Sequence, residues 1–199
     1  MRKLTRTKLP DEVQCSLRDA VSRGLAWDDF DKRQVRGCLR AMQSGFCAYC
    51  ERKLDSLDAR TRIDHFVPQS SAKGATRVFD WTNHYLSCDC HDTCDSHKSN
   101  DEREIVNPDT EDPVHYLTYL PTGAICIVPG ISSEDSRKAQ DTIEVLNLGC
   151  RSLSDSRVIA FNRLLKHAGE PVLREFVRNH VVEFHTFCEF MLSRKPTAH

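Results

Sequence analysis

Apolar residues recur at helical spacing in two stretches near the start of the chain, residues 11–23 and 28–43. The apolar positions that share one helical face in these stretches are Val13, Leu17, Ala20, Val21, Val35, Leu39 and Met42. Apolar residues placed three or four positions apart line one side of an α-helix. The pattern therefore predicts two amphipathic helices, which together make residues 1–44 an N-terminal helical segment.

The middle of the chain has short apolar runs bounded by proline, glycine and polar residues. Residues 60–66 predict a strand that Pro68 terminates, and the aromatic-rich residues 79–86 predict a second strand or extended segment. Residues 69–76 between them predict a polar loop. A short helix is expected over residues 95–101.

Helical spacing returns in the last third of the chain, after a hairpin signal. Residues 114–119 and 124–128 flank Pro-Thr-Gly, which predicts two strands joined by a turn. Gly169 interrupts the helical pattern that follows, and Pro171 suits the first turn of a final helix that runs to about Leu192. We interpret residues 108–199 as a hairpin plus a C-terminal helical region that packs with the rest as one compact unit.

Composition limits the classes of protein that fit this pattern. The 199 residues are 39% hydrophobic, which is enough for one core, and 28 basic residues face 29 acidic ones. This balance excludes a general basic coat for nucleic acid, so any polyanion site must be a local patch. The opening hexapeptide lacks the apolar segment of a signal peptide, and no apolar run reaches transmembrane length. We therefore expect a cytoplasmic protein with no membrane partner.

Five of the ten cysteines cluster between positions 47 and 94. In a reducing compartment, clustered thiols indicate metal ligands rather than disulfides. Cys47 and Cys50 form a C-x-x-C knuckle and, with Cys94 and one further ligand, can build a tetrahedral Zn²⁺ site. The fourth ligand would come from the second cysteine cluster, where Cys88, Cys90 and His91 are the alternatives.

Between the two knuckles lie residues suited to phosphodiester hydrolysis. His65 can act as a general base because imidazole titrates near neutral pH, and Asp64 offers an oxygen ligand suited to Mg²⁺. Adjacent strand residues point to opposite faces, so both serve one site only where the strand twists or ends. Asn83 can orient His65 without titrating. Beyond Cys94, the last of the clustered cysteines, the chain offers further candidates for the site. Asp95 or His97 can act as a further metal ligand, and Lys98 is either a phosphate contact or a solvated helix residue.

These motifs resemble the HNH endonucleases with a ββα-metal motif. The shared patterns are Cys-x-x-Cys, Asp-His-x-x-Pro, Asn followed five residues later by Cys, and Cys-x-x-x-Lys. More narrowly, segments 46–51, 63–66, 79–83 and 86–88 resemble the PtuB-like HNH proteins of Septu and retron-associated antiphage systems. The resemblance implies an α+β fold, in which a small zinc-stapled ββα-metal HNH core over residues 45–107 is flanked by N-terminal and C-terminal helices.

The resemblance also implies roles for individual residues in a nuclease that cuts DNA, or an RNA such as tRNA. It assigns His65 as general base, Asp64 as a ligand of catalytic Mg²⁺ or Mn²⁺, and Asn83 as the middle Asn, with Zn²⁺ as structural metal. Cys88 is favoured over Cys90 because it stands five residues after Asn83. The final HNH residue usually follows the last zinc cysteine directly, where this chain has Asp95. His97, two residues later, is the position we favour.

The resemblance further implies partners. These are nucleic acid, a PtuA-like ATPase and, in retron-associated systems, a reverse transcriptase with its RNA–DNA. The expected last helix carries more apolar side chains than the core of one chain requires, namely Phe176, Phe184, Phe187 and Phe190. We hypothesise that this helical region, with the N-terminal helices, docks an ATPase whose state gates the nuclease. Self-association through the same face and simple core packing are the alternatives. The alternative function is a non-catalytic zinc-binding module for nucleic acid or a partner. Asp64 beside His65 favours the enzyme, because a binding module needs no base next to a metal carboxylate.

Overall fold

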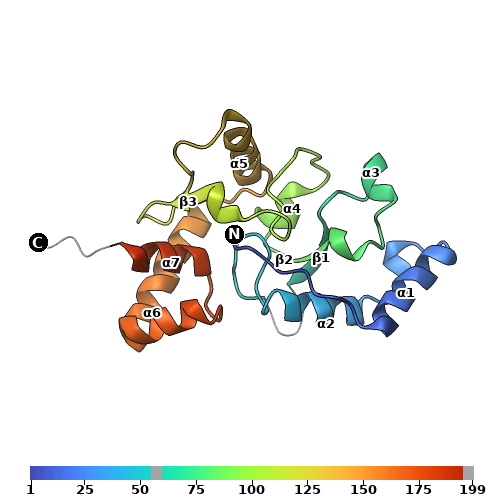
Figure 1. The fold of residues 1–199 in the computed structure, drawn as a ribbon, viewed down its shortest axis with the longest axis horizontal. Coiled ribbons are helices and arrows are strands. Elements are labelled where there is room, and N and C mark those ends of the chain that lie inside the picture. The colour runs from blue at the N-terminus through green and yellow to red at the C-terminus, as the bar shows by residue number, and fades with distance from the viewer. Residues whose placement is uncertain (55–59, 195–199) are drawn as a thin grey trace, which may run out of the picture.

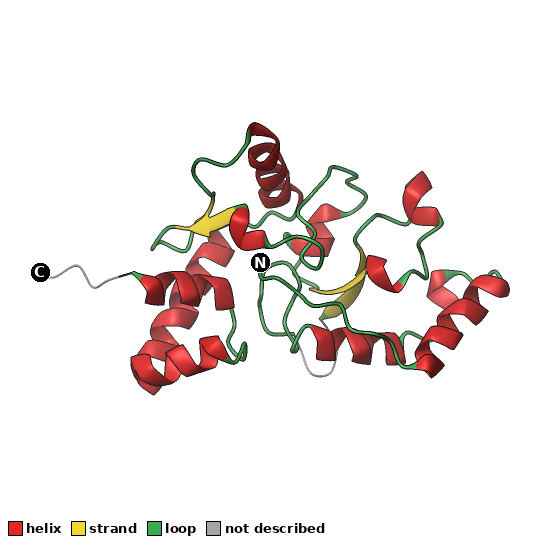
Figure 2. Cartoon of the chain, in the orientation of Figure 1, coloured by secondary structure: helices red, strands yellow, loops and turns green. Residues whose placement is uncertain are grey.

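A computed structural model describes residues 1–54 and 60–194 as a mixed α+β fold, mostly helical, with two small antiparallel sheets (Figure 2). In chain order the elements, with η marking a 3₁₀ turn, are α1 (Asp11–Ser22), η1 (Trp27–Asp29), α2 (Arg33–Met42), β1 (Thr61–His65), α3 (Ala72–Ala75), η2 (Trp81–Asn83), β2 (His84–Cys88), α4 (Cys94–Lys98), η3 (Pro113–His115), β3 (Leu117–Tyr119), β4 (Ile125–Ile127), α5 (Ser133–Val145), α6 (Arg151–Arg178) and α7 (His185–Ser193). Within the described ranges, no helix combines the length and the apolar character needed to cross a membrane.

The two N-terminal helices are confirmed, and the second is shorter than expected. It begins at Arg33 because Trp27–Asp29 forms a separate 3₁₀ turn and Phe30 is extended, with φ −82° and ψ 136°. Val35 and Leu39 are fully buried on the inner face of α2. This face packs against β2, so α2 supports the sheet that carries the candidate site (Figure 1).

Strands β1 and β2 form an antiparallel pair in which Asp64 lies opposite Tyr85 and His65 lies opposite His84. The second strand begins later than expected because Asp80 caps a 3₁₀ turn, its side chain accepting a hydrogen bond from the Thr82 amide. All five residues of β2 are buried. The strand is therefore covered on both faces, with α4 as well as α2 in contact with it. A short helix, α3, interrupts the expected polar loop.

The expectation of one final helix from Pro171 to Leu192 is wrong. Gly169 does break the helical geometry, with φ 76° and ψ 165°, but the helix ends at Arg178 and α7 begins only at His185. His180 and Phe184 adopt positive φ values of 56° and 51°, which ends one helix and starts the next. Helix α7 packs against α6 and β3 at the end of the molecule opposite α1 (Figure 1).

This break corrects the proposal of a surplus of apolar residues on the last helix. Phe184 and Phe187 are 3% and 0% exposed, and Phe176 and Phe190 are half-buried. The Phe187 ring packs edge-on against Tyr119, with ring centroids 5.5 Å apart. The last helix therefore contributes core side chains. The N-terminal, central and C-terminal segments all contribute to one cluster of buried side chains.

Candidate metal centre and catalytic cleft

The first cysteine knuckle is a tight turn fastened to α2 and β2. A backbone bridge between Phe46 and Lys53 and a bond from the Cys47 amide to the Arg52 carbonyl, 2.9 Å, close the turn. Gln43, fully buried at the end of α2, donates to the Phe46 carbonyl at 2.8 Å and to the Leu86 carbonyl at 2.9 Å. Its own side-chain oxygen accepts from the Leu86 amide. One amide thus holds the knuckle against β2.

The other two thiols of the cluster come from the ends of two elements. Cys88 is the last residue of β2, and Cys94 is the first residue of α4. Cys94 has a positive φ of 57°, and its amide donates to the Leu146 carbonyl at 2.9 Å. The five residues between these cysteines form a loop that brings the chain back to the end of β2.

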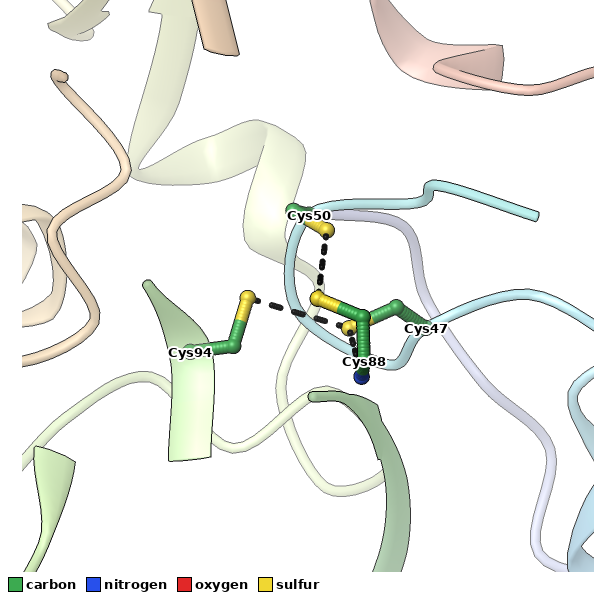
Figure 3. Close-up of side chains that lie close together, drawn as sticks. All are labelled: Cys47, Cys50, Cys88 and Cys94. Atoms are coloured by element: carbon green, nitrogen blue, oxygen red, sulfur yellow. Dashed lines mark hydrogen bonds between the residues drawn. The ribbon is translucent and has the colours of Figure 1, made fainter. Parts of the chain in front are cut away.

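The four thiols of Cys47, Cys50, Cys88 and Cys94 face one point (Figure 3). Their sulfur atoms all lie within 4.8 Å of one another, with 3.6 Å between Cys50 and Cys88 and 3.8 Å between Cys47 and Cys94. A zinc ion bound to four sulfurs at ~2.3 Å requires sulfur–sulfur separations of about 3.8 Å. The four buried cysteines therefore form a group that can hold a structural metal such as zinc.

Cys90 and His91 lie outside this group. Cys90 is half-exposed, with its sulfur 2.7 Å from Nη1 of Arg52, and His91 is exposed. The structure thus brings together the set that contains Cys88. The Arg52 guanidinium adds positive charge beside thiols that carry negative charge when they bind a metal.

A cleft of about 440 Å³ opens on the outer side of β1, beside this metal centre. Asp64, His65 and Asp95 all line it. The rest of its lining comes from η1, the α2 region, β1 itself, the loop after β1, and α4 with the residues that follow it. These residues are Trp27, Asp28, Lys32, Arg36, Thr61, Arg62, Ile63, Pro68, Gln69, Ser96, Ser99 and Asn100. Asp64 and His65 reach the same cleft because His65 is the last residue of its strand.

The ring of His65 is held in one orientation. Its Nε2 lies 2.9 Å from the Val78 carbonyl oxygen, and its ring packs edge-on against Trp27 with centroids 4.7 Å apart. A carbonyl only accepts hydrogen bonds, so Nε2 carries the proton and Nδ1 keeps its lone pair. Burial lowers the pKa of His65 below its ordinary value of 6.5, which favours this neutral form.

Asn83 acts on the backbone around His65 rather than on its ring. Its side-chain oxygen accepts from the Val67 amide at 2.8 Å, and its nitrogen donates to the carbonyls of Val67 and Arg77 at 3.1 and 3.3 Å. Arg77 precedes Val78, whose carbonyl holds His65. The fully buried Asn83 therefore ties together the two loops that fix the imidazole.

The buried Asp64 and the half-buried Asp95 bring two carboxyl groups together. Burial and the neighbouring Asp64 carboxyl raise the pKa of Asp95 to about 8. The Lys98 ammonium lies 2.8 Å from Oδ1 of Asp64. Neighbouring carboxyl groups that repel each other when both are charged are suited to a divalent cation such as Mg²⁺, which offsets their negative charge.

The structure places His97 and Lys98 away from their expected roles. His97 is exposed, and its Nδ1 lies 3.0 Å from the Val145 carbonyl on α5, so Asp95 rather than the favoured His97 reaches the cleft. Lys98 is 2% exposed and donates to the carbonyls of His65 and Phe66 at 2.6 and 3.2 Å. The ammonium is thus engaged inside the protein instead of facing a phosphate.

Sequence reasoning missed three residues of the site. Tyr49, fully buried inside the first knuckle, donates its hydroxyl to Oδ2 of Asp64. Gln43 and Trp27 hold the knuckle and the imidazole. A tyrosine between two metal-ligand cysteines was a visible signal, because a buried hydroxyl requires a partner. Nothing local marked Gln43 or Trp27.

Comparison with known proteins adds one relative. No family model matches the chain. The Septu protein PtuB of Bacillus thuringiensis is 29% identical over 118 residues. The match covers 59% of this chain and 42% of that protein, so it spans less than half of the relative's length. The similarity supports a PtuB-like relationship.

Proposed function

We propose that the chain is a metal-dependent HNH endonuclease that hydrolyses phosphodiester bonds in nucleic acid as an effector of antiphage defence. The observation that carries this proposal is the meeting of Asp64, His65 and Asp95 in one cleft beside a four-cysteine metal centre. A base and a carboxyl pair at one cleft are the groups that metal-assisted hydrolysis requires.

His65 accepts the proton of the attacking water in this proposal. The Nε2–Val78 bond leaves the Nδ1 lone pair as the basic nitrogen, and burial keeps the ring neutral at pH 7. The water oxygen then bonds to phosphorus while the bond from phosphorus to the leaving sugar oxygen breaks. Asn83 contributes by fixing the loops around the ring, so that Nδ1 faces one direction.

Asp64 and Asp95 are the residues that would hold the catalytic cation. A bound Mg²⁺ or Mn²⁺ supplies positive charge that stabilises the developing charge on the phosphate. The two carboxyl groups lie on different elements, β1 and α4. The metal centre joins Cys94, the first residue of α4, to Cys88 at the end of β2, the strand that pairs with β1, and so helps to hold the two carboxyl groups at one cleft.

The cleft also has basic groups suited to a phosphate backbone. Lys32 and Arg36 of the α2 region and Arg62 of β1 line it. The formal net charge of the whole chain is −1, so its affinity for nucleic acid depends on these basic residues of the cleft and on a partner. DNA is the substrate we favour, with structured RNA as the second option.

The similarity to a Septu PtuB supports placement in a defence system of that kind. In a Septu-type system the partner is a PtuA-like ATPase, and the sequence motifs shared with retron-associated systems add a reverse transcriptase with its RNA–DNA as a further proposed partner. These partners are part of the proposal. The non-catalytic zinc module is the competing function.

The test offers DNA and RNA to the purified, zinc-loaded chain with and without Mg²⁺. We expect Mg²⁺-dependent cleavage that Asp64→Asn abolishes, because the amide is a weaker cation ligand than the carboxylate. Nucleic-acid binding should persist in this variant. Tight binding with no cleavage under any condition would instead identify a binding module.

A further inference from the structure

Both carboxylate oxygens of Asp64 are bound by side chains from segments that the metal centre holds in place. Oδ2 accepts from the hydroxyl of Tyr49, which lies between the ligand pair Cys47 and Cys50 in the first knuckle. Oδ1 receives the ammonium of Lys98 at 2.8 Å. Tyr49, Asp64 and Lys98 are 0%, 3% and 2% exposed, so water does not compete for these contacts.

The two residues that bind Asp64, Tyr49 and Lys98, come from opposite halves of the cysteine group. Tyr49 stands one residue before Cys50, and Lys98 ends the short helix that begins at Cys94. Lys98 also donates to the carbonyls of His65 and Phe66, which fixes its position independently of Asp64. Any displacement of either knuckle therefore moves one partner of the Asp64 carboxylate.

We propose that Tyr49 is a positioning residue that couples the structural metal centre to the catalytic cleft. Its hydroxyl, together with the Lys98 ammonium, sets the orientation in which Asp64 meets a divalent cation. This inference rests on the proposed function. Hydrogen bonds that orient a metal-ligating carboxylate change metal affinity or activity by about tenfold to a hundredfold when they are removed.

The protein contains a matched control for this hydroxyl. Tyr49→Phe removes one buried hydroxyl and keeps the ring. Tyr85 is equally buried, with its ring centroid 6.1 Å from that of Tyr49, but its hydroxyl donates to Asn107 at 2.7 Å. Tyr85→Phe therefore removes the same group from the same core without touching Asp64.

The experiment compares the two variants by zinc content, Mn²⁺ affinity and cleavage. Both should retain one zinc per chain by elemental analysis. Calorimetric titration of the zinc-loaded chain should show Mn²⁺ binding weakened about tenfold or more in Tyr49→Phe and unchanged in Tyr85→Phe. The single-turnover cleavage rate should fall with it, while affinity for nucleic acid stays the same.

Equal Mn²⁺ affinity in the two variants overturns the inference. So does loss of zinc from Tyr49→Phe alone, because Tyr49 would then serve the knuckle and not the carboxylate. If the wild-type chain cuts no nucleic acid, the proposed function fails and the Mn²⁺ comparison still decides the role of Tyr49. A wild-type chain that binds no Mn²⁺ overturns both.

Discussion

His65 is the residue on which the proposed chemistry depends most directly. His65→Ala removes the nitrogen that the cleft geometry prepares as a base, so cleavage should fall at least about a hundredfold. Fold and zinc content should stay the same, because the ring lies at the end of β1 and outside the cysteine group. Single-turnover cleavage with Mg²⁺ measures the effect.

The matched control for this prediction is His115→Ala. His115 is exposed in η3, outside the cleft, and its loss should leave the cleavage rate at the wild-type value. A His65→Ala protein that cuts as fast as the control removes His65 from the mechanism.

A second histidine connects the site to acid stability. Burial lowers the pKa of His84 to about 4, from an ordinary value of 6.5, and the side chain is fully buried. A depressed pKa means that the neutral ring contributes stability above pH 6.5, and this contribution is lost as the pH falls towards 4. Between pH 7 and pH 5 the loss amounts to ~2 kcal/mol.

His84→Gln removes this titration. The variant should lose ~2 kcal/mol less of its unfolding free energy than the wild-type chain between pH 7 and pH 5. Urea unfolding at both pH values, with zinc present throughout, measures the difference and cancels the effect of acid on the thiols. Equal losses in the two proteins would show that the pKa of His84 is the same in the folded and the unfolded chain.

At the scale of elements, the cysteine group joins short segments that bury little apolar surface of their own. Cys47 and Cys50 lie in a turn closed by one β-bridge, and α4 is a single turn of helix that begins at Cys94. Zinc binding at sites of this kind is worth about 10–16 kcal/mol, as much as the whole stability of a domain. The double variant Cys47→Ser/Cys50→Ser should therefore lose both the metal and the ordered core around β1 and β2.

Cys90→Ser is the control that separates the two possible ligand sets. Its thiol lies against Arg52, outside the group of four, so this variant should keep one zinc per chain and its near-ultraviolet circular dichroism. Elemental analysis decides the matter. Retention of zinc by the double variant, or its loss from Cys90→Ser, contradicts the assignment.

At the scale of the whole molecule, the proposed ATPase partner predicts gated activity. The isolated chain should cut slowly, since its near-neutral charge gives weak grip on nucleic acid. Adding a purified PtuA-like ATPase should raise the cleavage rate, and bound nucleotide should change it. A monomer with full activity that ignores both partner and nucleotide rules out this arrangement.

Docking of such a partner on the helical end requires exposed apolar side chains, and the structure shows which residues provide them. Ile159 on α6 is 63% exposed, whereas Phe184 and Phe187 are core residues. Ile159→Asp should weaken the complex without unfolding the chain. Leu120→Asp, at a residue 49% exposed in the β3–β4 turn that packs against α6 at Gly123, measures how far the docking face extends.

Local patterns in the sequence determined the two N-terminal helices, the hairpin and the chemistry-bearing residues. The 3.6-residue period predicted α1 and the inner face of α2, because burial of one face repeats along any amphipathic helix. The four cysteines that meet were also the favoured set, since two knuckles at that spacing are suited to one metal. The adjacent Asp64 and His65 predicted a site that both would line.

Tertiary packing decided which neighbours complete that site. In α4, Asp95 and Lys98 are three residues apart and share a face, so both reach Asp64, while His97 projects towards α5. Helical spacing alone does not say which face turns to the cleft. The chain reversal before α7 is likewise invisible to periodicity, because Phe184 and Phe187 are apolar whether they face a partner or the core.

The contacts that orient the site were beyond the reach of sequence for the same reason. Val78 holds His65 through a backbone carbonyl, which every residue type possesses. Tyr49 meets Asp64 across 15 positions of chain, a pairing set by the fold of the knuckle against β2. Sequence determines which groups are present and their local geometry, and only the packed structure determines which of them meet.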